Sequence, residues 1–278
     1  MSGGETAIVG ASARPDAEGS EARIACLQQH YGHLAAEPLL RAMLRLEFRS
    51  RIAVVSSFGA ESALILALVA EIDPNTPVIF LDTGKHFPET IAYRDRLAAH
   101  LGLTDVRWVQ PPAAALASTD PDGRLWERNP DACCHLRKVL PLERALAGMD
   151  AWITGRKRFQ SGQRADLQTI EAIDSRFKIN PLAKWSLAQV AAEFRARDLP
   201  RHPLVAQGYL SIGCAPCTSR VENDVPTRAG RWAGTNKTEC GIHRAPWARA
   251  ETSRRDPHAR NPASPCSAPS KTGQQGEG

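Results

Sequence analysis

Four of the seven cysteines fall into two close pairs, and their spacing indicates a shared ligand rather than disulfides. Cys133 and Cys134 are adjacent, and Cys214 and Cys217 are separated by Ala-Pro. Adjacent cysteines cannot bridge each other without strain, because a disulfide needs Cα atoms roughly 4.4–6.8 Å apart in a favourable geometry. A fifth cysteine, Cys240, stands apart in the stretch Glu-Cys-Gly-Ile-His. The pattern predicts that the paired thiols hold a metal centre and that Cys240 does the chemistry.

The identity of the metal centre depends on the spacing within each pair. Four thiolates suit zinc and an iron–sulfur cluster about equally by ligand type. Structural zinc sites generally use two C-x₂₋₄-C knuckles, and directly adjacent ligands do not make that turn. Adjacent cysteines at the start of one helix are able to reach two irons of a cubane, whose sulfur ligands are spread more widely. The adjacency of Cys133 and Cys134 therefore favours a cluster.

The basic residues indicate a small anionic ligand. The net charge of the 278 residues is +5, and much of the positive charge comes in short bursts, at Arg156-Lys157-Arg158 and at Arg228 with Arg231. One such burst alone is explained as readily by a solvated surface. No run of basic residues with interleaved aromatic side chains is present, which argues against nucleic acid as a partner.

The apolar residues predict an ordinary globular protein of the cytoplasm. No run of 18 or more apolar residues occurs, so we expect no transmembrane helix. No basic start followed by an apolar segment is present, so we expect no secretory signal. In the reducing cytoplasm, clustered cysteines more often bind a metal or act in catalysis than form disulfides.

Two glycine-containing turns, each after an apolar run, are candidate phosphate sites. Glycine lets the backbone approach a phosphate, and the helix that follows presents free amides and the positive end of its dipole. Neither turn has the Walker or the G-x-G-x-x-G pattern, so simple turn chemistry explains the first turn equally well when it is taken alone. The second turn, after the next predicted strand, favours a nucleotide. The candidate residues are Ser56, Ser57, Gly59, Ser62, Asp82, Thr83 and Gly84.

Apolar runs of strand length alternate with helical patterns along the chain. Strands are expected at 52–57, 78–82, 106–109, 151–154 and 177–179, and helices from about 22 to 46 and at 61–71, 88–101 and 187–196. This alternation predicts an α/β fold, with a mostly parallel twisted sheet and helices on both faces. In such a sheet, ligands lie at the carboxyl ends of the strands.

The two ends of the chain lack periodic apolar residues. Residues 244–278 contain no Val, Ile, Leu or Phe, and residues 1–21 are rich in Gly, Ser, Ala and Glu. Such segments bury too little apolar surface to offset their ordering entropy. We therefore expect disorder at 1–21 and 244–278 and a single domain over 22–243.

Three motifs together resemble the assimilatory adenylylsulfate (APS) reductases, which belong to the wider phosphoadenylylsulfate (PAPS) reductase family. They are Cys-Cys-His-Leu-Arg-Lys at 133–138, Gly-Cys-Ala-Pro-Cys-Thr at 213–218 and Glu-Cys-Gly-Ile-His at 239–243. Residues 81–90 and 160–164 fit the same family, so the resemblance extends over roughly residues 35–243. The first turn is similar to the phosphate loop of the adenine nucleotide α-hydrolase-like fold. It departs from the usual Ser-Gly-Gly-x-Asp-Ser at Ser57-Phe58 and at Glu61.

The resemblance implies a reaction as well as a fold. Cys240 would attack the sulfur of APS, AMP would leave, and thioredoxin would reduce the resulting S-sulfocysteine to release sulfite. The four paired cysteines would hold a [4Fe-4S] cluster with a structural and electrostatic role. Family members that use PAPS generally lack these cysteines, which favours APS as substrate. The family assigns the offsetting of substrate charge to positions that match Lys138, Arg164, Arg228, Arg231 and His243.

Three alternatives remain open. The first is a PAPS reductase or a dual APS/PAPS reductase. The second is an ATP-dependent adenylating or thiolating enzyme of the same fold, which we expect to keep the full Ser-Gly-Gly-x-Asp-Ser loop and to have no need of Glu-Cys-Gly-Ile-His. The third is a non-catalytic metal-binding module, which leaves Cys240 and both turns without a purpose. The sequence also leaves homo-oligomerisation open.

Overall fold

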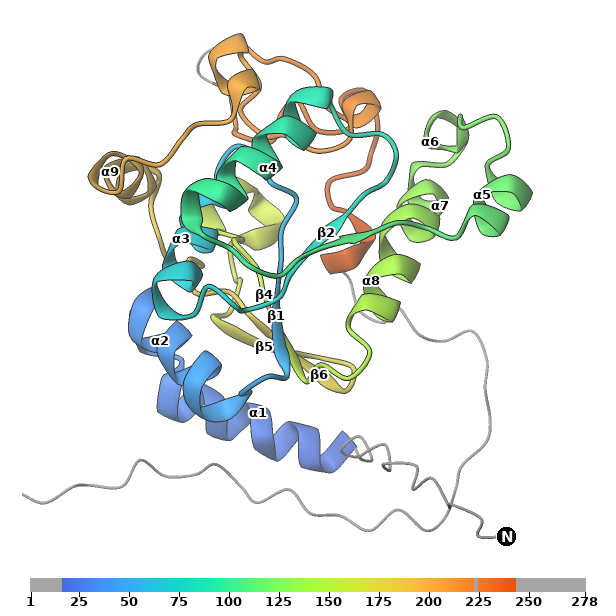
Figure 1. Cartoon of the computed structure of the whole chain (residues 1–278). Helices are drawn as coiled ribbons and strands as arrows, with labels where there is room; N and C mark the ends of the chain where they lie inside the picture. The colour runs from blue at the N-terminus through green and yellow to red at the C-terminus, as the bar shows by residue number, and fades with distance from the viewer. Residues whose placement is uncertain (1–16, 223–224, 244–278) are drawn as a thin grey trace, which may run out of the picture.

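A six-stranded sheet forms the centre of the molecule in the computed structural model, which describes residues 17–222 and 225–243 (Figure 1). The strand order is β3-β2-β1-β4-β6-β5. All neighbouring strands pair in parallel except β5 and β6, which are antiparallel. The expected mostly parallel sheet is therefore confirmed. The strands are β1 (Ile52–Val55), β2 (Val78–Leu81), β3 (Val106–Val109), β4 (Ala151–Ile153), β5 (Ile170–Ile173) and β6 (Arg176–Ile179).

Helices cover both faces of this sheet, as expected, and Figure 1 shows α3 and α4 on one side of it and α7 and α8 on the other. Alternate residues of β1 separate the two layers: Ile52 and Val54 pack in the core that contains α3, whereas Ala53 packs with Leu142 of α8. The helices are α1 (Ala17–Tyr31), α2 (Ala36–Ala42), α3 (Ser62–Ile72), α4 (Pro88–Leu101), α5 (Ala113–Thr119), α6 (Leu125–Arg128), α7 (Pro130–Cys134), α8 (Leu140–Ala145) and α9 (Leu187–Ala196).

Two predicted helices have the expected bounds, and their ends have identifiable causes. Helix α4 begins at Pro88, where no amide donor is needed, and ends at Gly102 in the left-handed region (φ 64°). Helix α9 begins after Ser186, whose hydroxyl accepts a hydrogen bond from the Gln189 amide at 3.2 Å. The sequence therefore encoded these boundaries locally.

Other elements differ from the expectation. The single helix expected from about residue 22 begins earlier, at Ala17, and is divided into α1, α2 and a π-helical turn at Met43–Glu47. Strand β5 was missed because Glu171 interrupts its apolar run. Helices α5 to α8 were also missed, since each has only four to seven residues and shows too little periodicity to detect.

The termini and one short internal segment lie outside the described residues. The disorder predicted for 244–278, and for most of 1–21, concerns residues that the structure does not describe, and so it stays a prediction. In the described ranges, no helix is both long and apolar enough to span a bilayer.

Candidate active site

A pocket at the carboxyl ends of β1 and β4 gathers most of the predicted site residues. Its walls come from the turn after β1, the loop after β4, the segment 210–213 and the C-terminal segment 227–243. This is the edge of a parallel sheet at which ligands are expected. The predicted residues that line it are Ser56, Ser57, Gly59, Ser62, Lys138, Arg164, Arg228, Arg231, Cys240 and His243.

The turn after β1 has a strained and closely packed backbone. Phe58 has a φ of 48°, in the left-handed region, and its amide donates to the Ser56 hydroxyl at 3.2 Å. A Cβ on Gly59 would lie 2.9 Å from the carbonyl oxygen of Ile212, on the opposite wall of the pocket. Glycine is therefore required by close packing across the pocket, and α3 begins three residues later.

The second predicted turn lies elsewhere. Asp82, Thr83 and Gly84 follow β2, and none of them lines this pocket. The Asp82 carboxylate accepts hydrogen bonds from Trp108 Nε1 at 2.7 Å and from Gln110 Nε2 at 2.6 Å. Thr83 lines the smaller pocket that contains the cysteine pairs. A ligand-binding role for Asp82 and Gly84 stays a prediction.

Cys240 is buried at the base of the pocket, 7% exposed. A hydrogen bond with the Cys134 thiol, the charge of Lys138 and the Ile242 amide all lower the pKa of Cys240, against the effect of burial. A thiol with a lowered pKa is more fully thiolate at neutral pH, and the thiolate is the nucleophilic form. The predicted role of Cys240 as nucleophile therefore has a matching environment.

Lys138 connects the candidate nucleophile with the cysteine pairs. Burial alone would lower its pKa, but the electrostatic influence of the nearby Cys214, Cys240 and Cys134 outweighs burial and raises it. Lys138 lines both the substrate-sized pocket and the smaller cysteine pocket. It is therefore a permanent cation in the wall between the two.

Glu239 fixes the residue next to Cys240 in place. Its carboxylate accepts from Arg164 Nε at 2.5 Å and from Arg164 Nη2 at 2.9 Å, and Arg228 approaches to 3.5 Å. The side chains of Arg164 and Glu239 are only 5% and 6% exposed. Burial would raise the pKa of Glu239, but the hydrogen bonds from Arg164 lower it below its usual range.

His243 closes the C-terminal side of the pocket as a neutral imidazole. Burial and then the charges of Lys178, Arg156, Arg164 and Arg228 hold its pKa well below the ordinary value. Its Nδ1 has no hydrogen-bond partner among the described residues. A neutral imidazole with an unused nitrogen is able to hydrogen-bond a ligand in the pocket.

The structure adds site residues that the sequence analysis did not select. Arg156, Lys157, Gln160, Glu61 and Glu239 also line the pocket. Lys157 is 1% exposed and donates to Glu61 at 2.8 Å, so its charge neutralises the acidic residue in the turn after β1. The burst Arg156-Lys157-Arg158 was a signal for these cations, but the sequence did not reveal which carboxylates they pair with.

All four paired cysteines line one small pocket, together with Trp126, Arg137 and Trp232. Cys133, Cys134, Cys214, Cys217 and Cys240 are free thiols. Burial raises the pKa of Cys133 to about 11. Within the two described ranges, no group of three or more His, Cys, Asp or Glu side chains is placed to hold a metal ion. The two pairs therefore line one pocket, whereas a metal centre stays a prediction.

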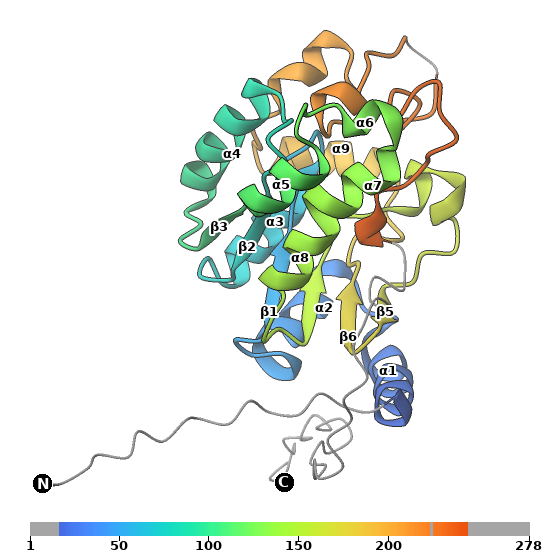
Figure 2. The ribbon, with the colours of Figure 1, turned by 90° about the vertical axis from the view of Figure 1, so that its right-hand side faces the viewer.

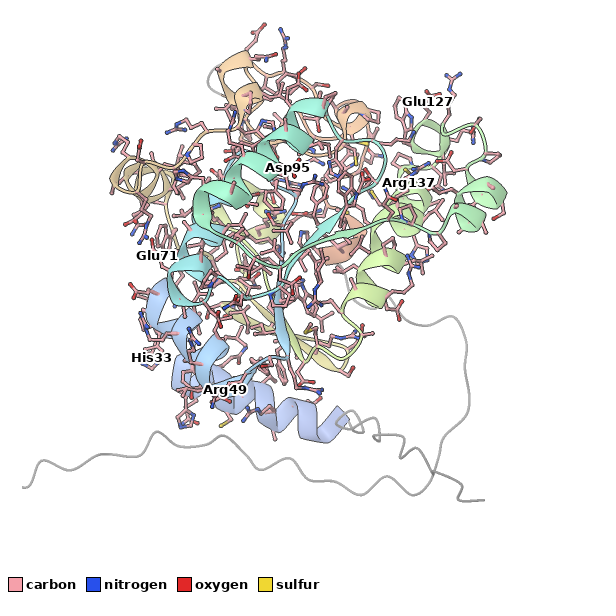
Figure 3. The ribbon with its side chains drawn as sticks, in the orientation of Figure 1. His33, Arg49, Glu71, Asp95, Glu127 and Arg137 are labelled. Atoms are coloured by element: carbon pink, nitrogen blue, oxygen red, sulfur yellow. The ribbon has the colours of Figure 1, made fainter. Side chains whose placement is uncertain are left out.

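Local contacts bring the two pairs together from distant parts of the chain. Asn129 accepts from the Ala132 amide at 2.9 Å and so caps α7, which ends with Cys133 and Cys134. Arg137, between α7 and α8 in Figure 3, pairs with buried Asp120 and donates to the Thr83 carbonyl at 2.7 Å. The Thr83 hydroxyl in turn lies 3.2 Å from Cys214 Sγ.

Trp232 lies in the wall of the cysteine pocket, beside the candidate nucleophile. It packs with Cys134 and Cys240 in one buried cluster. The guanidinium carbon of Arg231 lies 4.6 Å from its ring centroid, and Lys237 Nζ lies 5.6 Å from it. These cation–π contacts hold positive charge close to both sets of thiols.

The sequence and fold match those of known proteins. Residues 51–220 match a family model described as phosphoadenosine phosphosulfate reductase domain. A Mesorhizobium japonicum protein named adenosine 5'-phosphosulfate reductase is 53% identical over 226 residues, which are 81% of this chain and 89% of that protein. A Gloeobacter violaceus protein named phosphoadenosine 5'-phosphosulfate reductase is 42% identical over 223 residues, 78% of this chain and 92% of that protein.

A solved structure agrees with these matches. The phosphate complex of phosphoadenylyl-sulfate (PAPS) reductase from Candida auris superposes with a TM-score of 0.61 and 29% sequence identity. The superposition covers 76% of this chain and all of that chain. The fold neighbour and the sequence relatives therefore come from the same group of proteins.

Proposed function

We infer the function of the chain from its family. The chain belongs to the phosphoadenosine phosphosulfate reductase domain family, as the match over residues 51–220 and the 53% identical relative establish. The chain is an oxidoreductase that acts on sulfur. It reduces adenosine 5'-phosphosulfate (APS) to sulfite and AMP in assimilatory sulfate reduction. Two relatives at 53% and 50% identity carry the name of this activity.

One observation carries the proposal: a buried thiol lies in a pocket lined by cations. Cys240, Lys138, Arg228 and Arg231 share this pocket with His243. APS carries a sulfate joined to a phosphate, so attack by a thiolate brings several anions together. Two unit charges 4 Å apart repel by ~1–4 kcal/mol, depending on exposure. Fixed cations at the pocket wall offset this repulsion.

The residues divide the reaction between them. The Cys240 thiolate attacks the sulfur of APS, the bond between that sulfur and the bridging oxygen breaks, and AMP leaves with the electron pair. The product is S-sulfocysteine on Cys240. Lys138, Arg228 and Arg231 bind the sulfate and phosphate oxygens, and the planar guanidinium groups suit these oxyanions. His243 hydrogen-bonds the transferring group as a neutral imidazole.

A dithiol reductant completes the cycle. One thiol of thioredoxin attacks Cys240 Sγ and releases sulfite, and the second thiol then resolves the mixed disulfide. Cys240 returns as a thiol and thioredoxin leaves as a disulfide, so its two electrons account for the reduction of sulfate to sulfite. We propose thioredoxin as the partner and the cytoplasm as the location; five of the six described cysteines are free thiols.

The cysteine pocket is proposed to hold a [4Fe-4S] cluster on Cys133, Cys134, Cys214 and Cys217. The donor set fits, because these four free thiols surround one small pocket and a cubane takes one thiolate at each iron. A cubane needs no group of three protein ligands around any single metal ion. When bound, the cluster would supply a fixed charge beside Lys138 and would tie α7 to the segment 214–217.

A sulfite-release assay with thioredoxin tests the substrate and the reductant together. We expect sulfite from APS and at least tenfold less from PAPS at equal concentration. The 42% identical relative named for PAPS makes a dual enzyme the second candidate. Equal rates with both nucleotides would support dual use, and release from PAPS alone would contradict APS as substrate. The family match gives no support to the adenylating alternative.

Labelling with ³⁵S-APS tests the nucleophile. We expect the label on Cys240 and none in Cys240→Ser, whereas Cys266→Ser, which keeps Cys240 and the four paired cysteines, serves as the thiol control for labelling. Anaerobically purified Cys240→Ser should keep about four irons per chain, as a cubane requires. Sulfite release by Cys240→Ser would show that another residue is the nucleophile, and a colourless protein with zinc would refute the cluster.

A further inference from the structure

Lys178 is a lysine in the interior of the sheet that the proposed reaction does not use. It lies on β6, whose register pairs it with Trp152 of β4 and with Glu171 of β5. Lys178 is 0% exposed, and its Nζ has no hydrogen-bond partner among the described residues. Its Nζ lies 5.4 Å from the centroid of the Trp152 ring. Burying an ammonium group without a hydrogen-bonding partner is costly, so this position needs an explanation.

The carboxylates that face Lys178 are engaged by other groups. Glu171 accepts from Asn180 Nδ2 at 2.7 Å and from Arg156 Nη1 at 3.3 Å. Glu239 is held by Arg164, as described above. Neither carboxylate has a salt bridge to Lys178 in the described residues.

The cations that face Lys178 act against its charge. Arg156, after β4, and Arg164, on the turn Gly162–Arg164, both disfavour the ammonium form, and burial disfavours it more strongly than either. Together they lower the pKa of Lys178 to about 8, although Glu171 and Glu239 act in the opposite direction. His243, from the C-terminal turn, completes the set of titratable groups around it.

Lys178 lies immediately behind the pocket. Arg156, Arg164, Glu239 and His243 all line the pocket, whereas Lys178 does not. Figure 2 shows the C-terminal turn 241–243 lying beside β6, the strand that carries Lys178. A negative charge entering this pocket opposes the field of the arginines and so favours the ammonium form of a buried lysine.

We propose that Lys178 is a positioning residue that takes up a proton when the anionic sulfonucleotide enters the pocket, and that at alkaline pH it carries a full charge behind His243 only in the occupied enzyme. This inference rests on the proposed function. The lysine acts through the imidazole, because its charge is the strongest of those that disfavour protonation of His243. The occupied pocket then has a neutral His243 as a directed hydrogen-bond partner instead of a second cation.

Proton uptake is measurable by titration calorimetry of APS into the intact Cys240→Ser protein, which binds without turnover. The binding enthalpy is measured in buffers with different heats of ionisation. The slope of binding enthalpy against ionisation enthalpy gives the number of protons taken up. Since Lys178 with a pKa of about 8 is half charged at pH 8, we expect uptake of about 0.5 proton per APS at that pH. Uptake should rise toward one at pH 9 and disappear at pH 6.5.

Two lysine variants separate this role from a structural one. Lys178→Met in the Cys240→Ser background should bind APS with no proton uptake at pH 8. Lys184→Met, which removes an exposed lysine whose Nζ contacts only the Gly32 carbonyl among the described residues, should keep the full uptake. Undiminished uptake in Lys178→Met would overturn the proposal.

The pH dependence of proton uptake by the Cys240→Ser protein tests the role of Lys178 even if Lys178→Met does not fold. Absence of uptake at pH 8–9, or uptake that is largest at pH 6.5, contradicts the titration of a lysine. If APS does not bind at any pH, the inference and the proposed function fail together. Binding without uptake refutes only the role of Lys178.

Discussion

Glu239, the residue next to the candidate nucleophile, is held by a buried ion pair. It precedes Cys240, and its two carboxylate oxygens are held by one buried guanidinium group. Arg164 also donates to Gln160, so the guanidinium group that holds Glu239 is itself held in place. Any motion of Cys240 toward a protein reductant has to disturb this buried contact, because Cys240 itself is only 7% exposed.

Replacing Glu239 with Gln keeps the shape of the side chain and removes its charge. Arg164 and Arg228 are then left without a counter-charge, and breaking a buried pair in this way costs ~3–5 kcal/mol. We expect a drop of that size in the free energy of unfolding, measured by urea denaturation. Glu127→Gln is the control, since Glu127 pairs with exposed Arg124 at the periphery (Figure 3). Its loss should cost less than ~1 kcal/mol. Equal effects of the two variants would contradict a structural role for Glu239.

Long-range ion pairs are what the sequence could least predict. Arg164 and Glu239 are 75 residues apart, and Lys157 and Glu61 are 96 apart. No local pattern links such partners, because their approach depends on the strand order of the whole sheet. The basic residues selected from the sequence line the pocket, while their roles stay predictions, and the carboxylates that orient them were not recognised.

At the level of elements, the turn between β1 and α3 depends on a glycine with no room for a side chain. Gly59→Ala would place a Cβ 2.9 Å from the Ile212 carbonyl and push the two walls of the pocket apart. We expect a KM for APS at least tenfold higher and a stability loss of ~1–3 kcal/mol. Gly162→Ala is the matched control, because an added Cβ there meets nothing within 4 Å. Similar KM values for the two variants would show that the approach to Ile212 is unimportant.

Helix α1 is fastened to the π-helical turn Met43–Glu47 by Tyr31, whose hydroxyl donates to Glu47 at 2.6 Å. Burial and Glu47 raise the pKa of Tyr31 to about 12 from an ordinary value near 10. A raised pKa contributes stability that is fully present below pH ~10 and is lost as the pH rises through ~12. Tyr31→Phe should therefore lower stability by ~1 kcal/mol at pH 7.5.

Urea denaturation at pH 7.5 and pH 11 checks this expectation. The difference between Tyr31→Phe and the unmutated protein should be smaller at pH 11 than at pH 7.5. Tyr209→Phe, at a tyrosine outside this contact, should show no such narrowing. A constant difference at both pH values would mean that the hydroxyl contributes nothing through its ionisation.

Of the two predicted turns, the one after β1 lines the larger pocket and the one after β2 does not. Both predicted turns follow strands, and no pattern in the sequence indicates which of them lines the pocket. In the sheet, β1 lies between β2 and β4, so the turns after β1 and β4 face each other across the pocket. The turn after β2 faces the cysteine pocket instead, through Thr83. The two turns face different pockets because of the order of the strands in the sheet, which cannot be read from the sequence.

At the scale of the whole molecule, two pockets share one wall. Lys138 and Arg231 line both the larger pocket and the cysteine pocket. All four paired cysteines line the second of these pockets, and a metal centre there stays a prediction. Their contact with Cys240 could not be predicted, since Cys134 and Cys240 are far apart in the sequence and meet only in the folded chain.

The clustering of positive charge predicts a salt dependence for the reaction. The chain has a net charge of +5, and the pocket adds a local cluster of cations around an anionic substrate. Attraction between them weakens as the Debye length falls from ~30 Å at 0.01 M to ~8 Å at 0.15 M salt. We expect kcat/KM for APS to fall several-fold over this range at saturating thioredoxin. A sucrose series that matches the osmolality should leave kcat/KM unchanged, and a flat salt profile would contradict electrostatic steering.

The order of the thiols along the chain has a consequence for biosynthesis. Synthesis delivers Cys133 and Cys134 first, then Cys214 and Cys217, and Cys240 roughly twenty residues later. At ~5–20 residues per second, the ribosome adds Cys240 ~1–4 seconds after the last of the four pocket thiols. The four pocket thiols are therefore already made when the ribosome adds the thiol that packs against Cys134.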